Sequence, residues 1–275
     1  MNNKIGVMQG RLLPKYQGRY QAHPVNYWHK EFEVAREIGL DCIEFILDFN
    51  EVEKNPLMSS SGVIKINSMI KQTGVSVNTI CADYFMDKPL HNLDLNEAKA
   101  SFLILEHLLS IAGDIDITDI VIPCVDHSSL SDIDAVSRFI DKVGKLIPHL
   151  ESKNVNLSLE TDLAPLPFSK LLTELNCKNI TVNYDIGNSA AQGFDSSDEM
   201  SYYGHKITDI HIKDRLLAGG PVTLGEGDAD FSAFFNKLKE FNYKGPFIMQ
   251  AYRDEEGLEI FKKQLAWVKP YLESL

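Results

Sequence analysis

Four polar residues at the ends of apolar segments have the side-chain types of a metal site. Glu160 ends NVNLSLE, Asp185 ends ITVNYD, His211 lies in ITDIHI and Gln250 follows PFIM. Carboxylate, imidazole and amide groups can all coordinate a divalent cation. The set is rich in oxygen and contains one imidazole, which favours Mn²⁺, Mg²⁺ or Co²⁺ over Zn²⁺. We therefore predict a divalent metal ion bound by these four residues.

The elements that must bring these residues together are short strands separated by helices. Spacings of 25, 26 and 39 residues between the four positions each leave room for one βα unit. Short apolar segments, expected as strands, alternate with helical patterns along the whole chain. Eight such segments predict an α/β fold, a single-domain (β/α)₈ TIM barrel over residues 1–275. The expected strands are Lys4–Gln9, Cys42–Leu47, Ser76–Cys81, Asp119–Pro123, Asn156–Glu160, Ile180–Asp185, Thr208–Ile212 and Pro246–Ala251.

Barrel closure matters for function because the C-terminal ends of all eight strands then meet at one mouth, where active sites of this fold lie. The four residues belong to the fifth to eighth expected strands. An open, doubly wound sheet is the alternative, since periodicity alone does not prove closure.

Composition excludes several classes of partner. The chain has 275 residues, 44% of them hydrophobic, and its 27 basic and 39 acidic residues give a net charge of −12. This charge disfavours nucleic acid and anionic membranes as partners. The N-terminal segment does not resemble a signal peptide, and no apolar stretch has the length of a transmembrane helix. The four separated cysteines fit buried thiols, so we expect a cytoplasmic protein.

Four segments carry a resemblance to a known family: LSLET, YDIGN, DIHIKD and LGEGDADFSAFFNKLKEFNYKGPFIMQ. With them the chain resembles the xylose isomerase-like barrel superfamily, in its branch of sugar and sugar-phosphate isomerases and epimerases. The resemblance implies a divalent metal held by Glu160, Asp185, His211 and Gln250. It also implies proton exchange by two glutamates, on the fifth and eighth strands, in ketose 3-epimerases. Glu160 matches the first, but Gln250 replaces the second.

An amide oxygen can bind a metal but cannot act as a general base, so the second face of the substrate needs another group. His127, Asp83, Lys213 and a metal-bound water are the candidates. Alternatively, the reaction needs only one base, and Glu160 suffices.

Further residues are candidates for contacts with the substrate. Asn188 follows Asp185 where the epimerase branch often carries a histidine that touches substrate oxygens, although a simple turn residue is an equal alternative. Lys213 and Arg215 could orient a substrate oxygen or a phosphate, or form salt bridges with Asp214 or Asp209.

The remaining substrate-binding candidates lie near other strand ends. Arg11 could form an anion cradle with Arg215, Arg253 and the Gly219-Gly220 loop. Glu44 could line the mouth or support a metal ligand through a hydrogen bond. His127 follows the fourth strand and could contact substrate or lie exposed in its loop.

The function predicted from these features is a metal-dependent isomerase or epimerase of a small ketose or ketose phosphate, with Glu160 as the base. The product-forming step would pass through a metal-stabilised enediolate. One alternative is a metal-dependent lyase or dehydratase of an inosose-type keto-polyol. Another is a catalytically impaired sugar-binding homologue. A small-molecule sugar or sugar phosphate is the expected partner, and a homo-oligomer is compatible with the sequence.

Overall fold

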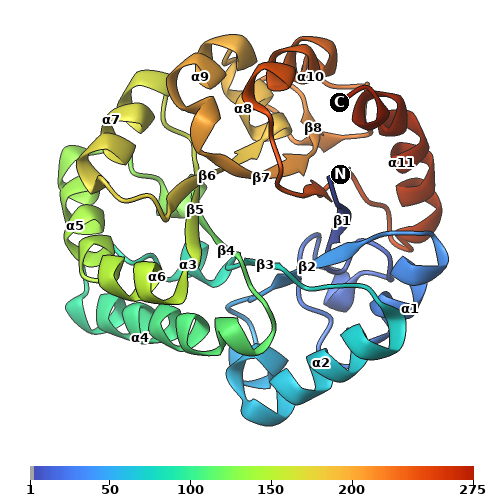
Figure 1. The fold of residues 1–275 in the computed structure, drawn as a ribbon, viewed down its shortest axis with the longest axis horizontal. Coiled ribbons are helices and arrows are strands. Elements are labelled where there is room, and N and C mark those ends of the chain that lie inside the picture. Colours follow the sequence, from blue (N-terminus) through green and yellow to red (C-terminus); the bar gives the residue numbers. More distant parts are fainter. Residues whose placement is uncertain (1–2) are drawn as a thin grey trace.

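A closed barrel of parallel strands forms the centre of the protein, described here for residues 3–275 by a computed structural model. Around the barrel the strands follow the order β1-β10-β7-β6-β5-β4-β3-β2, and β1 pairs with both β10 and β2. Figure 1 looks into this ring, with the helices outside it. Its strands are β1 (Ile5–Met8), β2 (Cys42–Ile46), β3 (Thr79–Cys81), β4 (Asp119–Cys124), β5 (Asn156–Thr161), β6 (Ile180–Asp185), β7 (Ile207–Ile212) and β10 (Phe247–Met249). The predicted (β/α)₈ barrel is confirmed, whereas the domain bounds 1–275 stay a prediction.

Helices cover the outside of the barrel and bury the apolar outer faces of its strands. They are α1 (Lys30–Glu37), α2 (Ser60–Thr73), α3 (Tyr84–Asp87), α4 (Leu95–Ile111), α5 (Ile133–Gly144), α6 (Ile147–Lys153), α7 (Pro165–Leu175), α8 (Ile186–Gln192), α9 (Ser196–Tyr203), α10 (Phe231–Leu238) and α11 (Leu258–Glu273). A large cluster of buried apolar residues fills the space between the strands and these helices. Because burial of apolar surface is the main stabilising contribution to folding, this layer fixes the strand ends that bear the site.

Strand register brings the four candidate residues to one end of the barrel. Asp185 on β6 lies opposite His211 on β7, and His211 lies opposite Ile248 on β10. Gln250 is two residues beyond Ile248, so it follows on the same face and nearer the C-terminal end. Glu160 is the fifth residue of β5, which pairs with β4 on its other side.

Each predicted barrel strand corresponds to an observed strand, with ends displaced by up to three residues. A second sheet, the two-stranded β8 (Asp214–Arg215) and β9 (Pro221–Val222), was not predicted. The carboxylate of Asp214 accepts hydrogen bonds from the backbone N–H groups of Gly225, Gly227 and Ala229. It therefore organises the loop after β7 instead of forming the salt bridge considered for it.

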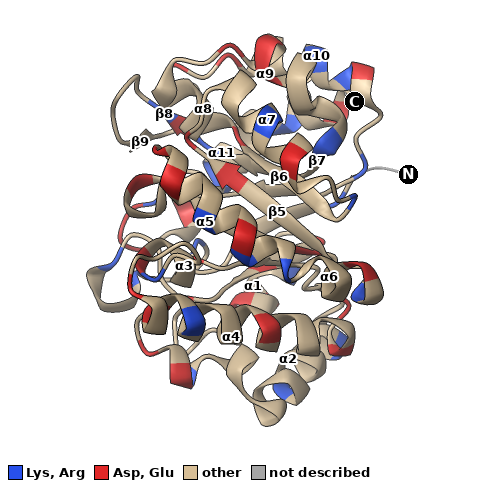
Figure 2. Ribbon diagram, turned by 90° about the vertical axis from the view of Figure 1, so that its left-hand side faces the viewer, with Lys and Arg blue, Asp and Glu red and all other residues tan. Residues whose placement is uncertain are grey.

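The surface of the molecule carries both signs of charge. Figure 2 shows Lys and Arg residues interspersed with Asp and Glu along the outer helices. All four cysteines are buried and unpaired, as expected for structural thiols. Among the described residues, no helix has the length and apolar character needed to cross a membrane.

Candidate metal centre

Glu160, Asp185 and His211 converge inside the C-terminal end of the barrel. One ligand atom from each lies within 4.8 Å of the other two. Nδ1 of His211 is 3.8 Å from Oε2 of Glu160 and 3.9 Å from Oδ2 of Asp185. These separations suit three groups around one cation, because ligands about 2 Å from a metal lie roughly 3 Å apart. All three side chains are buried.

The other nitrogen of His211 is already engaged. Its Nε2 lies 2.7 Å from Oε1 of Glu44, which is fully buried on β2. This contact orients the ring so that Nδ1 faces Glu160 and Asp185, as a hydrogen bond to a metal-binding histidine commonly does. Glu44 is absent from the lining of the cleft, so its position fits support of His211 and not contact with substrate.

A second buried acidic group lies beneath His211 but is less suited to a cation. Asp209 and Glu44 also approach His211 closely. Burial, together with the negative charge of Glu44, raises the pKa of Asp209 well above its usual range, which favours its neutral form. A neutral acid is a poor cation ligand, and Nε2 of His211 is occupied by Glu44. The group around Nδ1 is therefore the better candidate.

Ionisation in the metal-free protein reflects the crowding of these groups. Burial, and then the charge of Asp185, raises the pKa of Glu160 to about 7. Burial opposes protonation of His211, but the Glu44 carboxylate outweighs it and raises the pKa of His211 to about 9. A cation would displace these protons, because it binds the carboxylate and the neutral imidazole.

Asn183 is a member of the site that the sequence analysis missed. Its Nδ2 donates to Oε2 of Glu160 at 3.3 Å and lies 3.1 and 3.3 Å from the two ring nitrogens of His211. It precedes Asp185 by two residues on β6, and alternate residues of a strand face the same side. That spacing is the signal that could have identified it.

Gln250 lies beside the cluster and is held from two directions. Its Nε2 donates to Oε1 of Gln21 at 3.3 Å, while its Oε1 accepts from Nζ of Lys213 at 3.2 Å. The same Lys213 ammonium donates to Oδ2 of Asp185 at 3.2 Å. Lys213 thus forms an ion pair with Asp185, which neither sequence-based alternative for this residue included.

Asn188 connects Glu160 to Arg215. Its Nδ2 donates to Oε1 of Glu160, and its Oδ1 accepts from Nη1 of Arg215 at 2.8 Å. The backbone N–H of Asn188 also donates to Oδ1 of Asp185, which caps α8. Asn188 is therefore more than a turn residue, because it fixes the orientation of both carboxylates.

A cleft of about 450 Å³ opens above these residues. Glu160, Gln250, Lys213, Asn188, Arg215 and His127 all contribute to its lining. His127 lies in the short turn Asp126–Ser128 after β4 and is exposed. The volume lies within the usual range for a site that binds a small molecule.

Arg11 and Arg253 do not form the anion cradle considered from the sequence. Arg11 is buried and donates to the backbone oxygen of Tyr20 and to Gln21. Arg253 is also buried and donates to the backbone oxygens of Gly10 and Leu13. Both guanidinium groups donate instead to carbonyl oxygens of the loop after β1.

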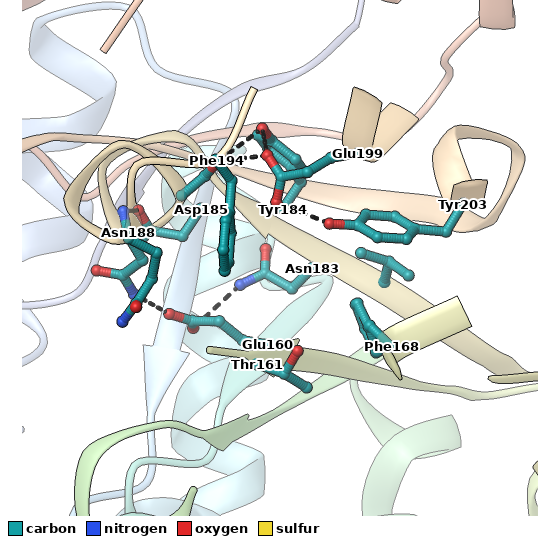
Figure 3. Close-up of a pocket in the computed structure, with 13 residues that line it drawn as sticks. Glu160, Thr161, Phe168, Asn183, Tyr184, Asp185, Asn188, Phe194, Glu199 and Tyr203 are labelled. Atoms are coloured by element: carbon teal, nitrogen blue, oxygen red, sulfur yellow. Dashed lines mark hydrogen bonds between the residues drawn. The ribbon is translucent and has the colours of Figure 1, made fainter. Parts of the chain in front are cut away.

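A small cavity of about 20 Å³ is lined by Glu160 and by residues of β5, β6, α8 and α9, which Figure 3 draws as sticks. Pairing between β5 and β6 ends at Leu159 and Val182, although both strands continue. Thr161 and Asn183 line this cavity, and within residues 3–275 their buried Oγ1 and Oδ1 atoms have no hydrogen-bond partner. The volume and the two polar atoms suit one internal water molecule.

The donor set fits a divalent cation. It combines two buried carboxylates with an imidazole nitrogen, and Gln250 adds an amide oxygen at its edge. The oxygen-rich composition accords with the preference of Mn²⁺ and Mg²⁺ for carboxylate and amide ligands.

The fold agrees with the comparisons to known proteins. The profile of the xylose isomerase-like TIM barrel family matches residues 32–271, and the chain belongs to this family.

Two relatives found by sequence comparison have the names of sugar-phosphate epimerases. The chain is 25% identical to SgbU of Haemophilus influenzae, a candidate L-ribulose-5-phosphate 3-epimerase, over 98% of this chain and 97% of that protein. It is 26% identical to the L-ribulose-5-phosphate 3-epimerase UlaE of Salmonella heidelberg, over 90% of each chain. Among solved structures, the 3-keto-D-glucoside 4-epimerase YcjR of E. coli superposes with a TM-score of 0.75 at 18% identity, covering 98% of this chain and 100% of that one. This last likeness extends to the fold alone.

Proposed function

We propose that the protein is a divalent-metal-dependent ketose 3-epimerase that accepts a ketose phosphate. The observation that carries this proposal is the convergence of Glu160, Asp185 and His211 beside the cleft, which Glu160 lines. The names of the relatives support the reaction class and favour a 5-phosphorylated ketose. Glu160, Asp185, His211 and Gln250 would hold the cation, with Mn²⁺, Mg²⁺ or Co²⁺ as the expected metal.

When bound, the cation would polarise the substrate carbonyl and stabilise negative charge on its oxygen. The protein residues then have to move a proton at the neighbouring carbon. Glu160 is suited to this task, because Asn183 and Asn188 hold its carboxylate at the cleft.

Proton transfer at the opposite face of the substrate needs a group other than Gln250, because an amide cannot act as a general base. Of the candidate groups, Lys213 is favoured because its Nζ lies 3.2 Å from Oε1 of Gln250 and it lines the cleft. His127 follows β4, the strand next to that of Glu160, and so is on the wrong side. Asp83 follows β3, which lies across the barrel from β7, the strand that precedes Lys213. The carboxylate of Asp83 accepts a hydrogen bond from Gln21.

Incubation with L-ribulose 5-phosphate and Mn²⁺ in D₂O, followed by NMR, tests the reaction. We expect deuterium at C3 together with the C3 epimer, because removal and return of the proton occur at that carbon. Free L-ribulose in parallel reports whether the phosphate contributes. Formation of an aldose with deuterium at C2, or deuterium at C1 of the recovered ketose, would indicate an isomerase, and loss of water would indicate a lyase. No exchange in either sugar, with the metal bound, would favour a non-catalytic sugar-binding protein.

A further inference from the structure

Lys213 contacts the two proposed ligands that come from β6 and β10. Its Nζ is 3.2 Å from Oδ2 of Asp185 and 3.2 Å from Oε1 of Gln250. The Asp185 side chain in this ion pair is 1% exposed and the Lys213 side chain 15%. A positive charge therefore lies against these ligands in the metal-free protein.

The oxygens that Lys213 contacts are the ones a cation would need. The other carboxylate oxygen of Asp185, Oδ1, accepts the backbone N–H of Asn188 at 2.8 Å. Gln250 has a single oxygen, and its amide nitrogen is directed to Gln21. Oδ2 of Asp185 and Oε1 of Gln250 are thus the oxygens of these two residues that remain for a cation. The Lys213 ammonium and a metal ion would therefore compete for these two oxygens.

The aliphatic stem of Lys213 passes close to α8, whereas its ammonium group lies at the open cleft. A side-chain carbon added at Gly187 would lie 2.8 Å from Cγ of Lys213, so the absence of a side chain there lets the stem pass close to α8. Among the described residues, Nζ donates to Asp185 and Gln250, and Lys213 lines the open cleft. Rotation about the terminal bonds can therefore carry the ammonium into the cleft without moving the backbone.

We propose that Lys213 is a built-in competitor of the divalent cation. In the metal-free protein its ammonium neutralises Asp185 and occupies Oε1 of Gln250, and it moves into the cleft when a cation binds. This role of Lys213 rests on the proposed metal centre, and it makes one residue responsible for lowering the affinity of that centre for its cation. Since like charges repel at short range, Lys213 weakens cation binding. Its displaced charge then adds to that of the cation, which suits an anionic substrate.

Mn²⁺ titration calorimetry on metal-stripped protein tests this role without measuring activity. Lys213→Met should bind Mn²⁺ at least about tenfold more tightly than the unchanged protein, because the competing charge is gone. Lys213→Arg keeps the charge and should show no such gain. Lys244→Met is the matched control, since Lys244 is exposed and precedes β10 at the opposite end of the barrel. The Mn²⁺ affinity of the Lys244→Met protein should equal that of the unchanged protein.

Equal or weaker Mn²⁺ binding by Lys213→Met would overturn the proposal while leaving the metal centre intact. Lys213→Gln replaces that variant if thermal unfolding shows that the methionine protein is not folded. Absence of Mn²⁺ binding in all of the proteins would overturn both the competitor role and the metal centre. Tight binding by the unchanged protein with a further gain in Lys213→Met would support both.

Discussion

Glu160→Gln should lower the rate of epimerisation by about 10²- to 10⁴-fold, the usual contribution of a general base. The amide keeps the size of the carboxylate and one oxygen for the cation, but it cannot accept the proton from C3. Exchange of the C3 proton with D₂O should fall together with inversion, because both need the same first step. Mn²⁺ should still bind, though less tightly. Rates of both processes can be read from one NMR time course.

Glu259→Gln is the matched control for this prediction. Glu259 is exposed on α11, where it pairs with Lys262. The same chemical change there should leave both rates unaltered. If Glu160→Gln retained the exchange rate of the unchanged protein, another residue would have to be the base on the first face.

Asp185→Asn should reduce Mn²⁺ affinity by more than about 100-fold, since even residues that only support metal ligands commonly contribute 10- to 100-fold. Oδ2 of Asp185 faces His211, and its negative charge offsets that of the cation. Oδ1 caps α8 by accepting the N–H of Asn188, a role that asparagine also performs well. The variant should therefore fold and lose mainly its affinity for the metal, as measured by titration calorimetry.

Asp195→Asn provides the comparison at a second helix start. Asp195 is exposed and caps α9 through the N–H groups of Ser197 and Asp198, but it takes no part in the site. Mn²⁺ affinity should change only for Asp185→Asn, and thermal unfolding shows whether each variant is folded. Unchanged affinity in both proteins would place the metal, if bound, elsewhere.

The barrel could be predicted because its sequence signals are local. Each strand is a short apolar segment, and each of Glu160, Asp185 and His211 lies on such a segment near its C-terminal end. Closure of the barrel then brings these ends together with no further information. Asn183 was within reach of the same reasoning, because it precedes Asp185 by two residues on β6.

Long side chains and loops could not be predicted in the same way. Arg11 was expected at the mouth, but the loop after β1 folds so that its guanidinium binds the oxygens of Tyr20 and Gln21. Lys213 was expected to meet substrate or a neighbouring aspartate in sequence, yet it pairs with Asp185 from another strand. A flexible stem can reach many partners, and tertiary structure decides among them.

Crystals soaked in Mn²⁺ and measured near the manganese absorption edge test the metal centre most directly. The anomalous difference map should contain one strong peak about 2.0 to 2.3 Å from ligand atoms of Glu160, Asp185 and His211, with Gln250 as the fourth ligand. Nζ of Lys213 should have left Oδ2 of Asp185 in the same crystals. A map without a peak at these residues, or with a peak held only by other side chains, would contradict the proposed site and the mechanism built on it.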